Sequence, residues 1–131
     1  MKLKEYNYWN LVLAESQHLI GWSIAKLKRD INFFEDLTDE ELLELKQVIK
    51  DVKQALNKTF KPDWFNVMQC GNMQPKLHVH LVPRYKEKRN FEGRDFVDNN
   101  FGGLVENKWV PEDNAFLEKL GCYISSYLRK T

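Results

Sequence analysis

The segment 76–84 reads Lys-Leu-His-Val-His-Leu-Val-Pro-Arg and contains two of the three histidines of this 131-residue chain. Side chains at positions i and i+2 of a strand lie on the same side. Lys76, His78 and His80 therefore share one face, and the apolar side chains between them form an opposite face suited to a core. Because cationic groups on one strand face repel each other, a phosphate bound over that face would account for all three.

The imidazole of His78 is the candidate reacting group, because histidine acts as a nucleophile or as a general acid and base near neutral pH. Attack on phosphorus would form a phosphoramidate-type intermediate and divide one displacement into two. His80 would orient the substrate or share protons. Lys76 and the backbone amides at the Gly71 turn would neutralise the charge that develops on the phosphate.

Two other interpretations of the histidine pair remain open. The two residues can be polar groups on a half-solvated sheet face, since short motifs often occur without function. They can also bind a metal ion. Asp95 or Asp98 would then have to supply a further ligand, because no third histidine lies nearby in the sequence.

The composition restricts the possible partners. The chain carries 20 Lys and Arg against 19 Asp and Glu, a net charge of +1, which argues against nucleic acid as a partner. A membrane partner is not expected either, because no apolar stretch has the length of a membrane span. The length and the 43% of hydrophobic residues predict a single domain over residues 1–131.

Several isolated residues are expected to have structural roles. Cys70 and Cys122 lack a C-x-x-C spacing, and the polar N-terminus lacks a signal-peptide core, so we expect reduced, buried thiols in a cytoplasmic protein. His18 is expected at the surface or in a turn. The four tryptophans are expected to be core or interface anchors.

Hydrophobic periodicity and turn signals predict an α+β fold. Alternation predicts strands over 9–14, 22–27, 64–70 and 77–84. Thr38 and Glu41 predict a capping box that opens a helix running to about Lys58, and Pro111 opens a C-terminal helix. We expect an antiparallel sheet of about four to five strands with both helices on one face. The segment 86–109 is expected to be a long loop over the sheet, with arginines that either clamp a polyphosphate or pack.

The motif His78-Val-His80-Leu-Val-Pro-Arg and the helix entry at residues 37–42 together resemble the histidine triad family of nucleotide hydrolases and transferases. The family signature is His-φ-His-φ-His-φ-φ, often followed by Pro-Arg, and this chain matches its last two histidines. The similarity covers about residues 9 to 84 and is closest to the diadenosine polyphosphate hydrolase type.

The resemblance implies a role for each matched residue. His78 corresponds to the nucleophile on the α-phosphate and His80 to a phosphate-binding residue, while Lys76 replaces the first histidine. The positions that match the strand and turn before the triad are substrate-binding candidates: Asn66, Gln69, Gly71 and Asn72. The nucleobase is expected near the first strands, where the candidates are Asn10, Leu11 and Ile20.

Four positions depart from the family pattern. Lys76 supplies a point charge but cannot accept the hydrogen bond that a neutral imidazole can. Met73 stands where a Ser or Thr often contacts phosphate, and Trp22 and Asp30 stand where many members carry histidine.

The expected activity is hydrolysis or nucleotidyl transfer at the α-phosphate of dinucleoside polyphosphates or nucleoside phosphoramidates, through a covalent nucleotidyl-His78 intermediate that yields AMP. No cofactor is expected, beyond a divalent metal that accompanies a polyphosphate. The resemblance also implies a homodimer. A catalytically weakened nucleotide-binding module and a metal-binding protein that uses His78 and His80 are the alternatives.

Overall fold

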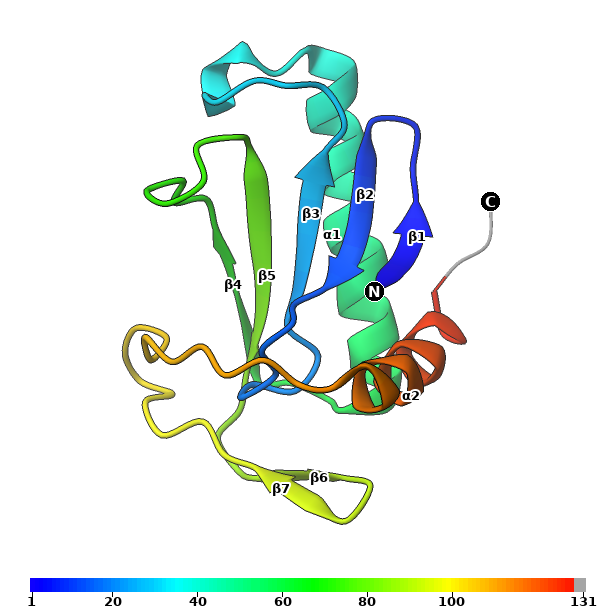
Figure 1. Cartoon of the computed structure of the whole chain (residues 1–131), viewed down its shortest axis with the longest axis vertical. Coiled ribbons are helices and arrows are strands. Elements are labelled where there is room, and N and C mark those ends of the chain that lie inside the picture. The colour runs from blue at the N-terminus through cyan, green and yellow to red at the C-terminus, as the bar shows by residue number, and fades with distance from the viewer. Residues whose placement is uncertain (129–131) are drawn as a thin grey trace.

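The computed structural model describes residues 1–128. Five antiparallel strands form one sheet in the order β1-β2-β3-β5-β4, and α1 lies behind it in Figure 1. The strands are β1 (Lys2–Glu5), β2 (Trp9–Leu13), β3 (Ser23–Leu27), β4 (Trp64–Met68) and β5 (His78–Arg84). The predicted α+β architecture is therefore confirmed, including the antiparallel pairing of β4 with β5.

The helix α1 (Asp39–Thr59) begins at the predicted capping box. The Thr38 hydroxyl accepts a hydrogen bond from the Glu41 amide at 3.1 Å, and the Glu41 carboxylate accepts one from the Thr38 amide at 2.8 Å. Arg29 on the segment after β3 donates to the same carboxylate at 2.8 and 3.0 Å. These bonds, led by that of Arg29, lower the pKa of Glu41 to about 2.

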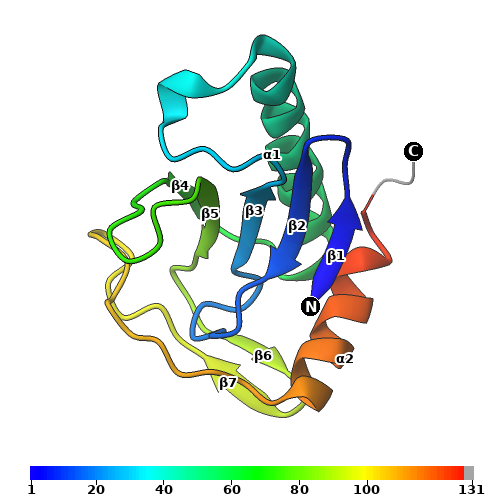
Figure 2. The same ribbon diagram turned by 45° about the horizontal axis from the view of Figure 1, so that its top comes forward.

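The main core lies between α1 and the sheet. Trp9 of β2 is fully buried there and donates its indole N–H to the backbone carbonyl of Glu41 at 2.8 Å. The second helix, α2 (Asn114–Ser125), lies beside β1 and the end of α1 and adds Leu120 and Ile124 to the core (Figures 1 and 2). No helix among residues 1–128 has the length and apolar character needed to cross a membrane.

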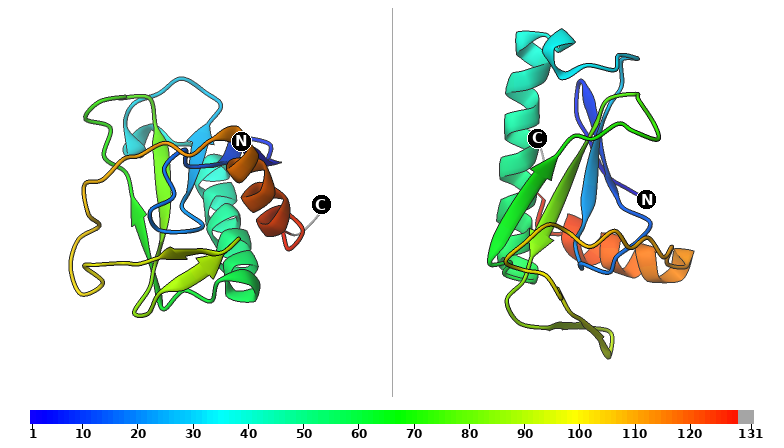
Figure 3. Two further views of the ribbon diagram at one scale, coloured as in Figure 1. Left: turned by 60° about the horizontal axis from the view of Figure 1, so that its bottom comes forward. Right: turned by 90° about the vertical axis from the view of Figure 1, so that its left-hand side faces the viewer.

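Part of the segment expected to be a long loop forms regular structure. A hairpin of β6 (Arg89–Phe91) and β7 (Arg94–Phe96) extends beyond the lower end of the sheet in the right-hand view of Figure 3. The guanidinium of Arg89 donates to the backbone carbonyls of Phe60 at 2.6 Å and Lys61 at 2.8 Å. This arginine therefore packs the hairpin onto the end of α1, which favours packing over a polyphosphate clamp.

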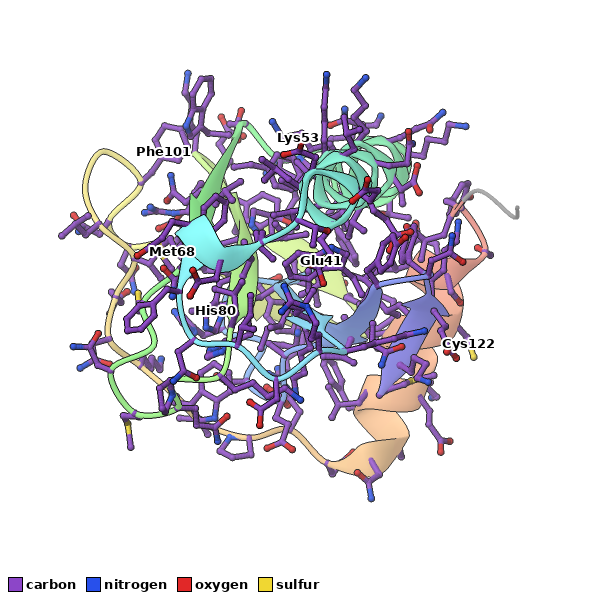
Figure 4. All side chains as sticks on the ribbon, turned by 90° about the horizontal axis from the view of Figure 1, so that it is seen from above. Glu41, Lys53, Met68, His80, Phe101 and Cys122 are labelled. Atoms are coloured by element: carbon purple, nitrogen blue, oxygen red, sulfur yellow. The ribbon has the colours of Figure 1, made fainter. Side chains whose placement is uncertain are left out.

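Two further elements escaped the sequence prediction. β1 is a short edge strand rich in charge, and a one-turn 3-10 helix spans Phe34–Asp36. The expected burial of the cysteines is wrong, because Cys70 lies in the turn after β4 and Cys122 lies on the exposed side of α2 (Figure 4).

The expected role of the tryptophans as core anchors is confirmed for two of them, and a role as interface anchors stays a prediction for the other two. Trp9 and Trp22 are buried, whereas Trp64 on the edge strand β4 is 66% exposed and Trp109 is 48% exposed.

Candidate active site

The two histidines of β5 lie on the sheet face opposite α1, which we call the histidine face. Val79 and Leu81 alternate with them and belong to the core under α1. The register pairs His78 with Lys26 of β3, and His80 with Ile24 of β3 on one side and Met68 of β4 on the other. Figure 4 shows His80 and Met68 close together.

The ring of His78 is oriented by the backbone. Its Nδ1 lies 2.8 Å from the carbonyl oxygen of Lys76. Because a carbonyl only accepts hydrogen bonds, Nδ1 carries the proton, and in the neutral ring Nε2 then carries the lone pair. The tautomer of His78 is therefore the one that a nucleophile acting through Nε2 needs.

The ring of His80 is oriented by a tryptophan. The indole Nε1 of Trp22 lies 3.0 Å from Nδ1 of His80, and the two rings meet edge to face with their centroids 5.7 Å apart. Because an indole N–H only donates, Nδ1 of His80 holds the lone pair and its Nε2 carries the proton. His80 is thus held as a hydrogen-bond donor.

Burial reinforces the neutral state of His80. Desolvation, and after it the charge of the neighbouring His78, lower the pKa of His80 to about 4. At neutral pH His80 is an uncharged donor. The ring centroids of His78 and His80 are 5.2 Å apart, so a lone pair and an N–H in opposite tautomers stand side by side on the histidine face.

The lysine at the first triad position leaves this arrangement intact. Lys76 orients His78 through its backbone carbonyl, which any residue at that position would supply. Its side chain is exposed, and its ammonium group has no hydrogen-bond partner among residues 1–128. Its charge is therefore available to an anionic ligand.

The end of β5 beyond His80 is bound to the rest of the chain through Arg84. This side chain is 2% exposed and makes five hydrogen bonds, including two to the carboxylate of Asp98 at 2.7 and 3.1 Å. Its other acceptors are the Asn66 side chain and the carbonyls of Asn100 and Gly103. The segment 97–110, which crosses in front of the lower sheet in Figure 1, is anchored by this arginine.

The other predicted substrate-binding residues lie in three different parts of the structure. Asn66 lies on the histidine face, but its side-chain oxygen accepts from Arg84 at 2.7 Å. Gly71, with φ of +80°, and Asn72 lie in the turn before β5. Gln69 follows β4 and lines an apolar groove of about 870 Å³ between β4 and α1. The structure therefore places His78 and His80 side by side, leaves Lys76 in the bend just before β5, and directs Gln69 toward the helix side.

Two of the three base-pocket candidates lie elsewhere. Leu11 and Ile20 are fully buried in the main core and therefore cannot contact a nucleobase. Asn10 lies on the histidine face, opposite Lys26. Its side-chain oxygen is buried and accepts no hydrogen bond within residues 1–128.

Sequence reasoning missed the contribution of Trp22, while His18 lies in the bend between β2 and β3, as the prediction of a surface or turn position requires. His18 is half-buried against the Trp22 ring, with the centroids 5.4 Å apart, and neither of its ring nitrogens has a partner within the described residues. Desolvation lowers the pKa of His18. The apolar residues Leu19 and Ile20, which follow His18, indicate that this connection is partly buried.

The residues near the histidine pair do not form an evident metal site. No group of three or more His, Cys, Asp or Glu side chains within residues 1–128 is placed to hold an ion. Asp98 is bound to Arg84, and Asp95 accepts from Asn90 at 3.0 Å. The two carboxylates named for the metal interpretation are thus engaged in the hairpin and in the anchor of the segment 97–110.

Known proteins share this architecture. The HIT domain family matches residues 24–87. A curated relative, the asymmetrical bis(5'-nucleosyl)-tetraphosphatase of Schizosaccharomyces pombe, is 31% identical over 96 residues, which are 66% of this chain and 52% of the relative. The chain thus spans about half the length of that relative.

Solved structures of histidine triad proteins have the same fold. That from Sinorhizobium meliloti superposes with a TM-score of 0.79 at 21% identity, covering 98% of this chain and 89% of the other. That from Marinobacter aquaeolei gives 0.74 at 22% identity, covering 98% and 88%. The family match, the curated relative and these folds agree: residues 24–87 are a HIT domain, and the described chain has the fold of histidine triad proteins.

Proposed function

We propose that this protein hydrolyses dinucleoside polyphosphates or nucleoside phosphoramidates, or transfers the nucleotidyl group, at the α-phosphate through a nucleotidyl-His78 intermediate. The observation that carries the proposal is the pair of opposite tautomers on the histidine face. Nucleotide hydrolase activity is also supported by the family and by the tetraphosphatase relative. The substrate, the intermediate and the release of AMP are the parts that the proposal adds.

The first chemical step uses the lone pair on Nε2 of His78. A bond forms between this nitrogen and the α-phosphorus, while the bond from phosphorus to the leaving group breaks and its electrons depart with that group. The ring becomes cationic, and its Nδ1–H bond to the Lys76 carbonyl stabilises that charge. The N–H of His80 donates to an oxygen of the reacting phosphate.

The second step restores the enzyme. Water, or an acceptor hydroxyl in a transferase, attacks the same phosphorus and loses its proton to solvent. The bond to His78 breaks with its electrons returning to Nε2, so the nucleoside monophosphate or its ester leaves. In this proposal the Lys76 ammonium and the amides of Gly71 and Asn72 offset the charge on the phosphates. Asn66 and Gln69 remain candidate contacts, and a divalent ion enters only with a polyphosphate substrate.

Product analysis with diadenosine tetraphosphate and adenosine phosphoramidate tests this activity. We expect AMP from the wild type and a trapped nucleotidyl adduct on His78 after rapid quench in alkaline denaturant, which preserves the acid-labile P–N bond, with neither from His78→Ala. AMP binding without product from either substrate would instead identify a weakened nucleotide-binding module. Stoichiometric zinc that resists dialysis and is lost in a His78→Ala, His80→Ala double variant would identify the metal-binding alternative.

The homodimer is a proposal as well, and the edge of β4 supports it. β4 ends the sheet, and the groove between it and α1 exposes apolar side chains that include Leu42, Leu43 and Val67. Two β4 edges in antiparallel contact would continue the sheet and cover the groove. Sedimentation should show that Leu43→Glu yields monomers, while Leu104→Glu, at a site 84% exposed, stays dimeric.

A further inference from the structure

Lys26 stands next to the proposed nucleophile in a row of residues across three strands. The register pairs Asn10 of β2 with Lys26 of β3, and Lys26 with His78 of β5. Side chains directly opposite each other in a sheet have Cβ atoms about 4.5–5.5 Å apart. The long, flexible stem of Lys26 therefore places an ammonium group within reach of any ligand bound at His78.

The neighbouring Lys28 forms an ion pair within residues 1–128, whereas Lys26 does not. Lys28, two residues later, donates to the carboxylate of Glu5 at 2.7 Å. Lys2 donates to the same carboxylate at 3.4 Å, and these bonds, led by that of Lys28, lower the pKa of Glu5. Glu5 pairs with Asn10 in the same row, yet it is already held by two lysines that are not Lys26.

The charge of Lys26 has no protein counterpart. Its side chain is exposed, and within residues 1–128 its ammonium has no hydrogen bond or ion pair. The paired residues of β2 to β5 on this face include no carboxylate: Asn10, Val12, Ile24, Lys26, Trp64, Asn66, Met68, His78, His80, Val82 and Arg84. An anion is the partner that fits beside His78.

We propose that Lys26 binds the phosphate bonded to the reacting one, and that it selects polyphosphate substrates over phosphoramidates. The inference rests on the proposed function. His80 already supplies a neutral donor for the reacting phosphate. The ammonium of Lys26 serves the next phosphate, one P–O–P linkage away, which a phosphoramidate does not contain. Lys26 is thus a specificity-determining residue for the leaving group.

The experiment compares kcat/KM of the full chain on diadenosine tetraphosphate, diadenosine triphosphate and adenosine phosphoramidate. Removing one charge-assisted contact costs about tenfold, so Lys26→Gln should lose about tenfold on both polyphosphates, mainly through KM. On the phosphoramidate the loss should be about twofold, because only the overall electrostatic potential at the site changes. Lys26→Arg should recover most of the loss, since it keeps the charge.

Lys28→Gln is the matched control, because it removes the same charge from the same strand end but breaks only the bond to Glu5. It should change all three rates equally and by less than about twofold. An equal loss by Lys26→Gln on all three substrates would overturn the inference and leave the proposed function intact.

A binding measurement keeps the inference testable if the wild type turns over none of the substrates, which would overturn the proposed function itself. Calorimetry with inorganic tripolyphosphate should then show binding about tenfold weaker for Lys26→Gln than for Lys28→Gln. Equal affinities in the two variants would overturn the role of Lys26 as well.

Discussion

The histidine face has two halves that use the same strands in opposite ways. In the closed half, the segment 97–110 covers the sheet: Trp109 packs edge-on against Trp22, and Arg84 has each of its donors near an acceptor. In the open half, around His78, the exposed ammonium of Lys26 has no partner within residues 1–128. The closed half holds the fold together, and the open half leaves polar groups for a ligand.

The boundary between the halves is the contact of Trp22 with His80. The indole ring packs in the closed half, and its N–H determines which ring nitrogen of His80 carries the proton. A covered, rigid region therefore orients the group that contacts substrate. The following substitutions separate what each half contributes.

The largest effect on activity is expected in the open half, from His78→Ala. Removing the nucleophile should lower kcat by roughly 10³-fold or more, because no other side chain supplies an equivalent lone pair. The melting temperature should stay close to that of the wild type, since the ring is only half-buried. Wild-type turnover by this variant in a steady-state assay would end the covalent mechanism.

The largest effect on stability is expected in the closed half, from Arg84→Met. It leaves the carboxylate of Asp98, 4% exposed, without its cation, which costs about 3–5 kcal/mol of unfolding free energy. Chemical denaturation measures the loss. Arg94→Met is the control, because it breaks an ion pair to Glu112 at a side chain 51% exposed and should cost less than about 1 kcal/mol. Equal losses would show that Arg84 is no special anchor.

Trp22→Phe tests the boundary itself. A smaller aromatic ring remains, but the N–H that fixes His80 is lost, so kcat should fall about tenfold, the value of one hydrogen bond. The ¹⁵N shifts of His80 should change from one tautomer to a mixture, which a purely structural role of Trp22 would not produce. Trp109→Phe, which alters only the packing partner of Trp22, should leave the His80 tautomer unchanged.

The pH dependence of stability tests whether His80 is held neutral in the folded protein. His80 has a pKa of about 4 in the folded protein and about 6.5 when unfolded, so the unfolded state binds more protons between these values. The unfolding free energy should therefore rise with pH from about 4 to about 6.5, by an amount of order 1 kcal/mol after solvent screening. Denaturation series of the wild type and His80→Asn would differ in slope only within this window; parallel curves would contradict the assignment.

The smallest effect is expected at the first triad position. Lys76→His keeps the carbonyl that orients His78, so activity should stay within about threefold of the wild type. Steady-state kinetics on one substrate are sufficient to measure it. A gain of a hundredfold would mean that the missing imidazole, rather than the backbone, limits the reaction.

Local patterns predicted much of this structure, and long-range pairing accounts for what they missed. The capping box at Thr38 and the alternation around His78 depend on neighbours in sequence, so the α1 start and β5 were readable. The pair Glu92-Gly93, where both residues have positive φ, is also a local turn signal, and it predicts the hairpin between β6 and β7. The register that places Lys26 beside His78 joins residues far apart in the chain and follows only from the assembled sheet.

The bond from His78 to the Lys76 carbonyl bears on how such active sites are recognised. The atom that orients the nucleophile belongs to a peptide unit, which every amino acid carries, so no substitution at that position deletes it. The side chain at position 76 can therefore vary, or can change to suit a more or less anionic leaving group. A search pattern that demands three histidines would discard chains that retain the whole orienting apparatus.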